Sequence, residues 1–183
     1  MTDDLSLLLL PTTLLAVALA VLGCGSSEEV PVGIREVRTT AGHPAPHPAG
    51  PFDADDPAIG NLDPELLVAL QAAGRDARAD GVALEVTSGW RTREHQQRLY
   101  DEAVADYGSE EEARRFVATP DTSAHVTGDA VDIGPTDGAL WLGEHGSGYG
   151  LCQVFANEIW HFELATEAGG SCPEMLPDGS SRT

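Results

Sequence analysis

Apolar residues in the middle of the chain recur at spacings that predict a helix, a strand and a second helix in succession. The first helix is expected to begin after Asp63, with Pro64 at its first position, and to end near Gly81. The apolar run 82–87 then predicts a strand. Residues 92–107 carry apolar side chains along one helical face, so we expect the second helix there.

The next segments predict shorter elements and a small sheet. Residues 109–117 begin with a capping-box pattern and predict a short helix. The apolar run 130–133 predicts a strand, while 151–155 and 159–164 predict a hairpin with its turn at 156–158. No internal repeat is visible. Together these elements indicate an α+β fold, with a small, mostly antiparallel sheet flanked by helices.

The N-terminus carries an apolar run followed by a cysteine. Residues 14–23 have the length of a signal peptide and are too short for a comfortable transmembrane helix. Residues 21–24 resemble a bacterial lipobox, in which the cysteine becomes the lipidated new N-terminus. We therefore expect a lipoprotein-type signal peptide over 1–23 and lipidation of Cys24. Plain secretion and an uncleaved anchor are the alternatives.

Composition divides the rest of the chain into three parts. Residues 24–58 are rich in proline, glycine and acidic residues, a pattern that predicts a tether without a packed core. The periodic segments lie within 59–175, which we expect to be one folded domain. The polar, glycine- and serine-containing residues 176–183 are expected to form a flexible tail.

The charge of the chain limits the partners that it can bind. Its 183 residues carry a formal net charge of −20, and no lysine is present. Nucleic acids and anionic membrane surfaces bind through basic patches, so this composition argues against both as partners. We expect contact with a membrane only through the N-terminal lipid or anchor, and we expect a monomer.

Two cysteines remain once Cys24 is assigned to the leader. In the oxidising compartment that the leader indicates, we expect Cys152 and Cys172 to form a disulfide. On the loop-entropy model, closing this short loop raises the free energy of unfolding by about 3 kcal/mol. The alternative, a pair of buried free thiols, requires a reducing cytosol.

Two histidines and an aspartate have the chemistry of a catalytic zinc site. Asp132 lies in an apolar strand, where a carboxylate is costly unless a cation or a donor compensates it. His125 and His161 supply imidazole nitrogen, and three such ligands leave the fourth tetrahedral position of Zn²⁺ open for water. Taken singly, His125 is better explained as a loop histidine and His161 as a core histidine beside Trp160. Taken together, the three predict a zinc site.

Two charged residues are candidates for catalysis beside this site. Glu158 precedes His161 by three residues, so the chain must bend near Ile159 for both to reach one metal. There Glu158 would act as the general base that takes a proton from water; the alternative is a solvated turn glutamate. Arg91 suits the oxyanion of an attacked carbonyl, and its alternative is a surface ion pair.

Four further residues lie near these candidates in the sequence. Ser123 and Gln96 are candidate substrate-binding residues, but Ser123 can instead cap the turn before His125, and Gln96 can instead satisfy a buried backbone group. Glu163 can orient the imidazole of His161 or face solvent. We expect Trp160 to pack beneath the metal.

Three blocks of sequence combine these residues in one order and spacing. They are Ser88-Gly89-Trp90-Arg91 with Gln96 and Leu99-Tyr100, then Ser123-x-His125-x-x-Gly128-x-Ala130-x-Asp132-Ile133, and finally Glu158-x-x-His161. Over about residues 62–166 the chain resembles the D-alanyl-D-alanine carboxypeptidase and dipeptidase family of zinc peptidases, the VanY- and VanX-like proteins. The resemblance implies the α+β fold of that hedgehog/D-Ala-D-Ala peptidase type, with the zinc site on the sheet. It also favours a pocket-facing Gln96.

The resemblance implies a function as well. We expect a zinc-dependent D,D-carboxypeptidase that hydrolyses the terminal D-Ala-D-Ala bond of peptidoglycan stem peptides, located outside the cytoplasm in the cell envelope. The alternatives are an L,D-carboxypeptidase or L-alanyl-D-glutamate endopeptidase of the same fold, and a non-catalytic, zinc-stabilised module that binds the cell wall. The short link 155–158 favours a cleft open to a polymeric substrate.

Overall fold

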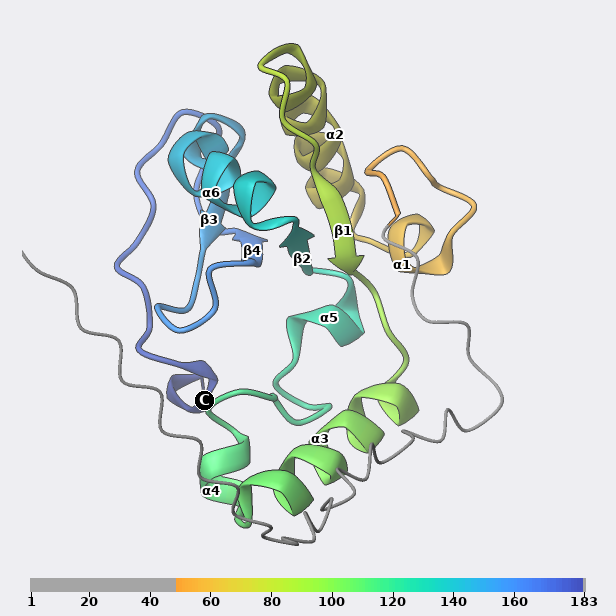
Figure 1. Cartoon of the computed structure of the whole chain (residues 1–183), viewed down its shortest axis with the longest axis vertical. Coiled ribbons are helices and arrows are strands. Elements are labelled where there is room, and N and C mark those ends of the chain that lie inside the picture. Colours follow the sequence, from red (N-terminus) through yellow and green to blue (C-terminus); the bar gives the residue numbers. More distant parts are fainter. Residues whose placement is uncertain (1–48, 183) are drawn as a thin grey trace, which may run out of the picture. The chain divides into compact units, whose positions relative to one another are not determined.

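The computed structural model describes residues 49–182, whose centre is a four-stranded antiparallel sheet (Figure 1). The strands are β1 (Glu85–Ser88), β2 (Ala130–Gly134), β3 (Leu151–Gln153) and β4 (His161–Leu164). They lie in the order β1-β2-β4-β3, and each neighbouring pair is antiparallel. The α+β fold predicted from the sequence is therefore confirmed, including the hairpin of β3 and β4.

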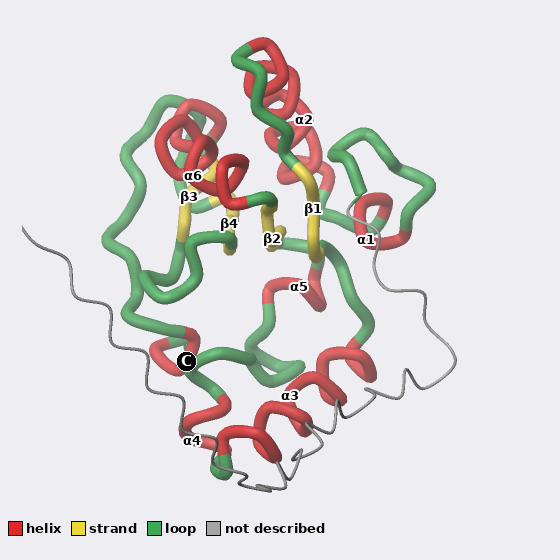
Figure 2. Tube along the Cα trace, viewed as in Figure 1, coloured by secondary structure: helices red, strands yellow, loops and turns green. Residues whose placement is uncertain are grey.

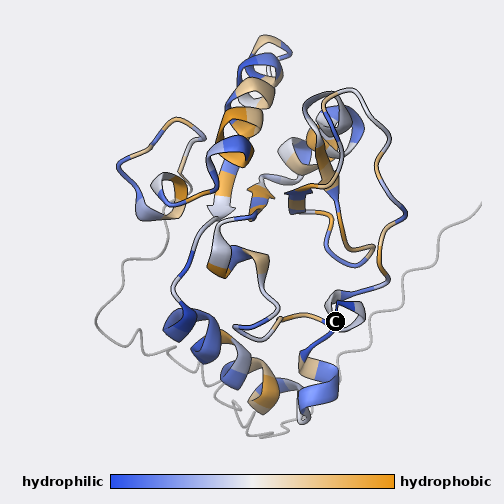
Figure 3. Ribbon diagram, turned by 180° about the vertical axis from the view of Figure 1, so that it is seen from behind, coloured by the Kyte–Doolittle hydropathy of each residue, from blue (hydrophilic) through white to orange (hydrophobic). Residues whose placement is uncertain are grey.

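The main core lies between the sheet and two helices, α2 (Pro64–Ala79) and α6 (Thr136–His145). Helix α2 begins as predicted, because the side chain of Asp63 accepts hydrogen bonds from two backbone N–H groups of its first turn. Figure 3 shows hydrophobic positions gathered on α2 and on the strands. Leu70 of α2 and Phe162 of β4 are completely buried in this core.

A second group of helices lies on the other side of the short helix α5 (Ala124–Thr127) from the sheet (Figures 1 and 2). It consists of α3 (Arg93–Tyr107), whose first turn Thr92 caps, and α4 (Glu110–Ala113). A small core joins these two helices and contains Tyr100, Ala103 and Ala113. The helix that we expected to reach Val117 ends at Ala113, and a turn follows it.

The folded part of the chain begins earlier than the sequence indicates. We expected the tether to extend to residue 58, but Ala49 pairs with Val86 through two backbone hydrogen bonds of 3.2 and 2.8 Å. Asp56 then caps helix α1 (Pro57–Gly60). The pairing of Ala49 with Val86 joins residues far apart in the sequence, so local composition does not reveal it. The expected signal peptide, Cys24 and residues 24–48 of the expected tether lie outside the described residues.

The C-terminal residues also pack on the domain where we expected a flexible tail. The predicted disulfide is present between Cys152 and Cys172 and joins the C-terminal segment to β3. The 3₁₀ helix η2 (Gly179–Ser181) follows, and a second 3₁₀ helix, η1 (Gly146–Tyr149), precedes β3. Among residues 49–182, no helix is both long enough and apolar enough to span a membrane.

Candidate metal centre and active-site pocket

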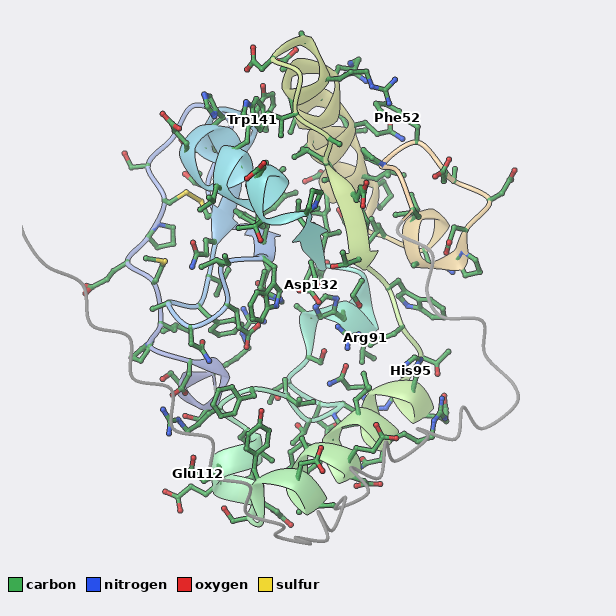
Figure 4. All side chains as sticks on the ribbon, in the orientation of Figure 1. Phe52, Arg91, His95, Glu112, Asp132 and Trp141 are labelled. Carbon is green, nitrogen blue, oxygen red and sulfur yellow. A yellow bond between two sulfur atoms is a disulfide. The ribbon has the colours of Figure 1, made fainter. Side chains whose placement is uncertain are left out.

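The three predicted metal ligands converge beside the sheet. His125 comes from α5, Asp132 from β2 and His161 from β4. Asp132 Oδ1 lies 3.3 Å from His125 Nε2 and 3.1 Å from His161 Nδ1. One ligand atom of each residue lies within 4.8 Å of the others, so the three side chains can hold one metal ion. Figure 4 shows Asp132 next to Arg91, on the side of the sheet that faces α3.

The backbone explains why these side chains meet. Asp132 and His161 are directly paired across the antiparallel strands β2 and β4, so their side chains lie on the same face of the sheet. Gly128 ends α5 with a φ of +85° and directs the chain into β2. A Cβ at this position would lie 2.6 Å from the carbonyl oxygen of Asn61. The close approach that places His125 therefore requires glycine.

Hydrogen bonds to the outer nitrogens determine which nitrogen of each histidine faces the site. His125 Nδ1 donates to the carbonyl oxygen of Gly89 at 2.9 Å, which leaves Nε2 towards Asp132. His161 Nε2 donates to Glu163 Oε1 at 2.7 Å, which leaves Nδ1 towards Asp132. Metal-binding histidines are commonly oriented in this way by a carbonyl or carboxylate behind the ring.

The charges of the cluster fit a divalent cation. Burial opposes ionisation of Asp132, but His125 and His161 outweigh this effect and hold the pKa of its carboxyl well below the usual range. Burial lowers the pKa of His161, whereas its hydrogen bonds to Asp132 and Glu163 raise it more strongly, to about 9. The mostly buried carboxylates thus attract positive charge. Two imidazole nitrogens and one carboxylate oxygen form a donor set that suits Zn²⁺.

Glu158 lies beside this cluster because the chain turns sharply before β4. The backbone N–H of His161 donates to the carbonyl oxygen of Glu158 at 3.2 Å and closes a turn through Ile159. This turn is the bend that the sequence required, and it brings Glu158 Oε2 to 3.9 Å from His161 Nδ1. Burial raises the pKa of Glu158 to about 7, with Asp132 adding to the shift and His161 opposing it. Such a carboxyl can both accept and release a proton near neutral pH.

Arg91 follows β1 and reaches the same cluster. Its backbone N–H donates to the carbonyl oxygen of His125 at 3.1 Å, which ties the loop after β1 to α5. Its Nη2 lies 3.5 Å from Asp132 Oδ2, and its side chain is only 16% exposed. Arg91 Nε is buried and finds no hydrogen-bond partner within residues 49–182. The alternative of a surface ion pair is therefore wrong, because the side chain lies mostly buried beside Asp132 in the lining of the pocket.

Gln96 and Ser123 form a hydrogen-bonded pair in the wall of the pocket. Gln96 is 2% exposed, and its Nε2 donates to the carbonyl oxygen of Ala118 at 2.7 Å. Ser123 Oγ donates to Gln96 Oε1 at 3.2 Å, and it makes no capping bond to α5. Both alternatives for Gln96 are therefore correct: its side chain donates to a backbone carbonyl, and it lines the pocket.

All of the predicted metal, catalytic and substrate-binding residues line one pocket. They are Arg91, Gln96, Ser123, His125, Asp132, Glu158 and His161. Sequence analysis missed further lining residues, among them Phe116, Phe155 and Arg182. It was wrong about Trp160, which is 44% exposed at the pocket rather than packed beneath the metal site. No local signal marks Arg182, because it lies in a polar segment that lacks periodicity.

Comparison with known proteins identifies the family. A family model described as "VanY: D-alanyl-D-alanine carboxypeptidase" matches residues 60–167, which is more than half of the chain. A curated D-alanyl-D-alanine carboxypeptidase of Enterococcus faecalis is 35% identical over 127 residues, which cover 55% of this chain and 47% of the relative. The chain therefore spans about half the length of this relative.

Two solved structures are similar in both sequence and fold. A point mutant of the D,D-pentapeptidase VanY from the VanB-type vancomycin resistance cassette, in complex with Zn(II), is 32% identical with a TM-score of 0.53, covering 60% of this chain and 73% of that protein. VanYB in complex with D-alanine-D-alanine is 33% identical, also with a TM-score of 0.53, covering 56% and 70%. Taken with the matching family model, these similarities show that the chain belongs to the VanY family of D-alanyl-D-alanine carboxypeptidases.

Proposed function

We propose that this protein is a zinc-dependent D,D-carboxypeptidase that removes the terminal D-alanine from peptidoglycan stem peptides. The observation that carries the proposal is the convergence of His125, Asp132 and His161 in one pocket that also holds Glu158 and Arg91. Relatives of about one-third sequence identity support the cofactor and the substrate, since one is in complex with Zn(II) and another with D-alanine-D-alanine.

The proposed ligands of Zn²⁺ are His125 Nε2, Asp132 and His161 Nδ1, the atoms that face one another in the structure. When bound, Zn²⁺ supplies Lewis-acid polarisation of a carbonyl and lowers the pKa of a water molecule at its open coordination position. Three protein ligands are typical of catalytic zinc, whereas structural sites usually have four. The set thus favours an enzyme over a zinc-stabilised module that only binds the cell wall.

Glu158 and Arg91 are the proposed catalytic residues. Glu158 takes a proton from the attacking water and delivers it to the nitrogen of the leaving D-alanine. Its raised pKa, about 7, suits both transfers. Arg91 donates to the oxygen on which negative charge develops, and its place in the pocket lining beside Asp132 supports this role.

Gln96 and Ser123 are the proposed holders of the terminal carboxylate of the substrate. One N–H of the Gln96 amide is used by the carbonyl of Ala118, so the other remains for a ligand. The hydroxyl of Ser123 can rotate from Gln96 Oε1 to a carboxylate oxygen. Both residues are buried in the pocket wall, where such donors discriminate strongly against substrates that leave them unpaired.

We further propose that the domain works in the cell envelope, outside the cytoplasm, as a monomer. The disulfide between Cys152 and Cys172 supports an oxidising compartment. The lipobox-like residues 21–24 support cleavage after residue 23 and lipidation of Cys24, with the following residues up to 48 acting as a tether. In this arrangement the lipid is the contact with the membrane, since the strongly acidic chain does not favour anionic lipid surfaces.

The test is to incubate the zinc-loaded full chain with a pentapeptide stem ending in D-Ala-D-Ala and, separately, with the corresponding tetrapeptide. We expect release of one D-alanine from the pentapeptide and no change in the tetrapeptide, as followed by mass spectrometry. Release from the tetrapeptide instead would identify an L,D-carboxypeptidase. Stoichiometric zinc with both peptides intact would identify a binding module and refute the proposal.

A further inference from the structure

The C-terminal segment is attached to the domain at successive points before it reaches the pocket. The disulfide of Cys172 with Cys152 holds its beginning against β3. Leu176 then makes backbone hydrogen bonds in both directions, to Val154 at 2.9 Å and from Ala156 at 2.8 Å. Asp178 accepts from Arg115 Nε at 3.0 Å. These contacts give the last described residues a defined path along the pocket.

This path ends with the side chain of Arg182 against the metal site. Arg182 Nη2 lies 2.7 Å from Glu163 Oε2, and its guanidinium lies 5.2 Å from the centre of the Phe155 ring. The side chain is 26% exposed and lines the pocket. It is therefore supported on one side by an aromatic ring and on the other by a carboxylate.

The two oxygens of Glu163 have different partners. Oε1 accepts from His161 Nε2 at 2.7 Å, while Oε2 accepts from Arg182 at 2.7 Å. Glu163 and His161 are two residues apart in β4, so their side chains share one face of the strand. Glutamate has three rotatable side-chain bonds, and a second partner on Oε2 restricts the rotamers that Oε1 can adopt. Arg182 thus limits the motion of the group that orients His161.

We propose that Arg182 is a positioning residue of the metal site, which acts through Glu163 to hold the ring of His161 with Nδ1 towards the metal. The inference rests on the proposed zinc site and adds to it a contribution from the C-terminal segment. Ion pairs at the surface usually contribute little to the stability of a protein. Here both side chains are mostly buried, and the pair also restricts the orientation of the Glu163 carboxylate behind His161. Arginine suits this role because its planar fork is pre-organised.

The experiment compares full-length wild-type protein with Arg182→Ala, Arg182→Lys and the matched control Arg114→Ala. Arg114 also pairs with a glutamate, at 2.7 Å, but this pair lies exposed at α4, and neither of its residues lines the pocket. Two quantities are measured: the affinity for Zn²⁺, by competition with a chelator, and the exchange with water of the Nε2 proton of His161, by NMR.

We expect Arg182→Ala to bind Zn²⁺ about tenfold more weakly. This is the lower end of the loss in metal affinity, roughly 10- to 100-fold, that follows when a residue that orients a metal ligand is replaced. The Nε2 proton of His161 should exchange faster in the same variant. Arg182→Lys should recover part of both losses, and Arg114→Ala should match wild type. If Arg182→Ala does not fold, Arg182→Gln replaces it, since this side chain removes the charge but keeps much of the length.

The inference is overturned if Arg182→Ala and Arg114→Ala have the same zinc affinity and the same exchange rate. A weaker affinity without faster exchange also overturns it, because Arg182 would then not act through His161. If wild-type protein binds no Zn²⁺, the proposed function fails. The exchange measurement on metal-free wild type and variants then still decides whether Arg182 holds the His161–Glu163 contact.

Discussion

Asp132 and His161 lie opposite each other on neighbouring antiparallel strands, and their Oδ1 and Nδ1 atoms are 3.1 Å apart. This cross-strand pair places two of the three proposed metal ligands on β2 and β4, the two central strands of the sheet. The third, His125, comes from α5, whose position depends on Gly128. The site is therefore largely preformed by backbone geometry, and the following predictions test its parts separately.

Glu158→Gln should remove the proton acceptor while leaving the metal ligands in place. We expect the variant to retain stoichiometric Zn²⁺ and to lose about 10²–10⁴-fold in kcat, the usual contribution of a general acid–base residue. Zinc content and D-alanine release from a pentapeptide stem measure the two effects. Unchanged turnover would exclude Glu158 as the base, and loss of zinc would show that it is a ligand instead.

The metal-free domain should lose stability as the pH rises from about 6.5 through about 9. His161 has a pKa raised from 6.5 to about 9 in the folded protein, so its contribution is complete below the lower value and is lost above the higher one. Glu158, with a pKa raised from 4.5 to about 7, shifts stability in the same direction between those two values, so its effect is nearly complete where that of His161 begins. Urea unfolding of the metal-free protein at several pH values measures the trend.

The protonation of His161 also makes zinc binding depend on pH. Zinc affinity should rise with pH, whereas the stability of the metal-free domain should fall. Because Zn²⁺ binds neutral imidazole, it must displace the proton that His161 holds below about pH 9. Zinc affinity should therefore rise with pH up to that value, and binding should release protons at pH 7. Calorimetry in buffers of different ionisation enthalpy detects the release. A pH-independent affinity between pH 6 and about 9 would contradict a role for His161 as ligand.

Gly128→Ala should displace His125. A Cβ at Gly128 would lie 2.6 Å from the carbonyl oxygen of Asn61, and φ is +85°. Gly108 is a matched control, since its φ is +80° but a Cβ there meets nothing within 4 Å. Gly108→Ala should cost about 1–2 kcal/mol from backbone strain alone. Gly128→Ala should cost more and should also weaken zinc binding, which Gly108→Ala should leave unchanged.

Removal of the disulfide should affect stability and the metal site together. Replacing Cys152 and Cys172 with alanine should lower the free energy of unfolding by about 3 kcal/mol, the loop-entropy value for a loop of this size. Because the disulfide holds the segment that carries Arg182, zinc affinity should fall as well. Urea unfolding and chelator competition measure the two. A stability loss with unchanged zinc affinity would show that the other contacts of the segment suffice to place Arg182.

The sequence by itself determined helices α2 and α3, the order of the four strands along the chain and most of the polar residues that line the pocket. Helix α2 begins at the cap that Asp63 predicts, and the bend before His161 lies where the spacing of Glu158 and His161 requires it. These features are local, because caps, turns and periodicity depend on residues a few positions apart. The α+β fold followed from the same signals.

The tertiary structure alone decided which groups surround the ligands. The carbonyl oxygen of Gly89 binds Nδ1 of His125, 36 residues away in the sequence, and so leaves Nε2 towards the site. Arg182 contacts Glu163, which is 19 residues away. Ala49 joins the domain by pairing with Val86, although its neighbours in sequence resemble a tether. Each of these contacts depends on the path of the whole chain through space. Local propensity carries no information about that path, so neither the pairing of Ala49 with β1 nor the contact of Arg182 with Glu163 could be predicted.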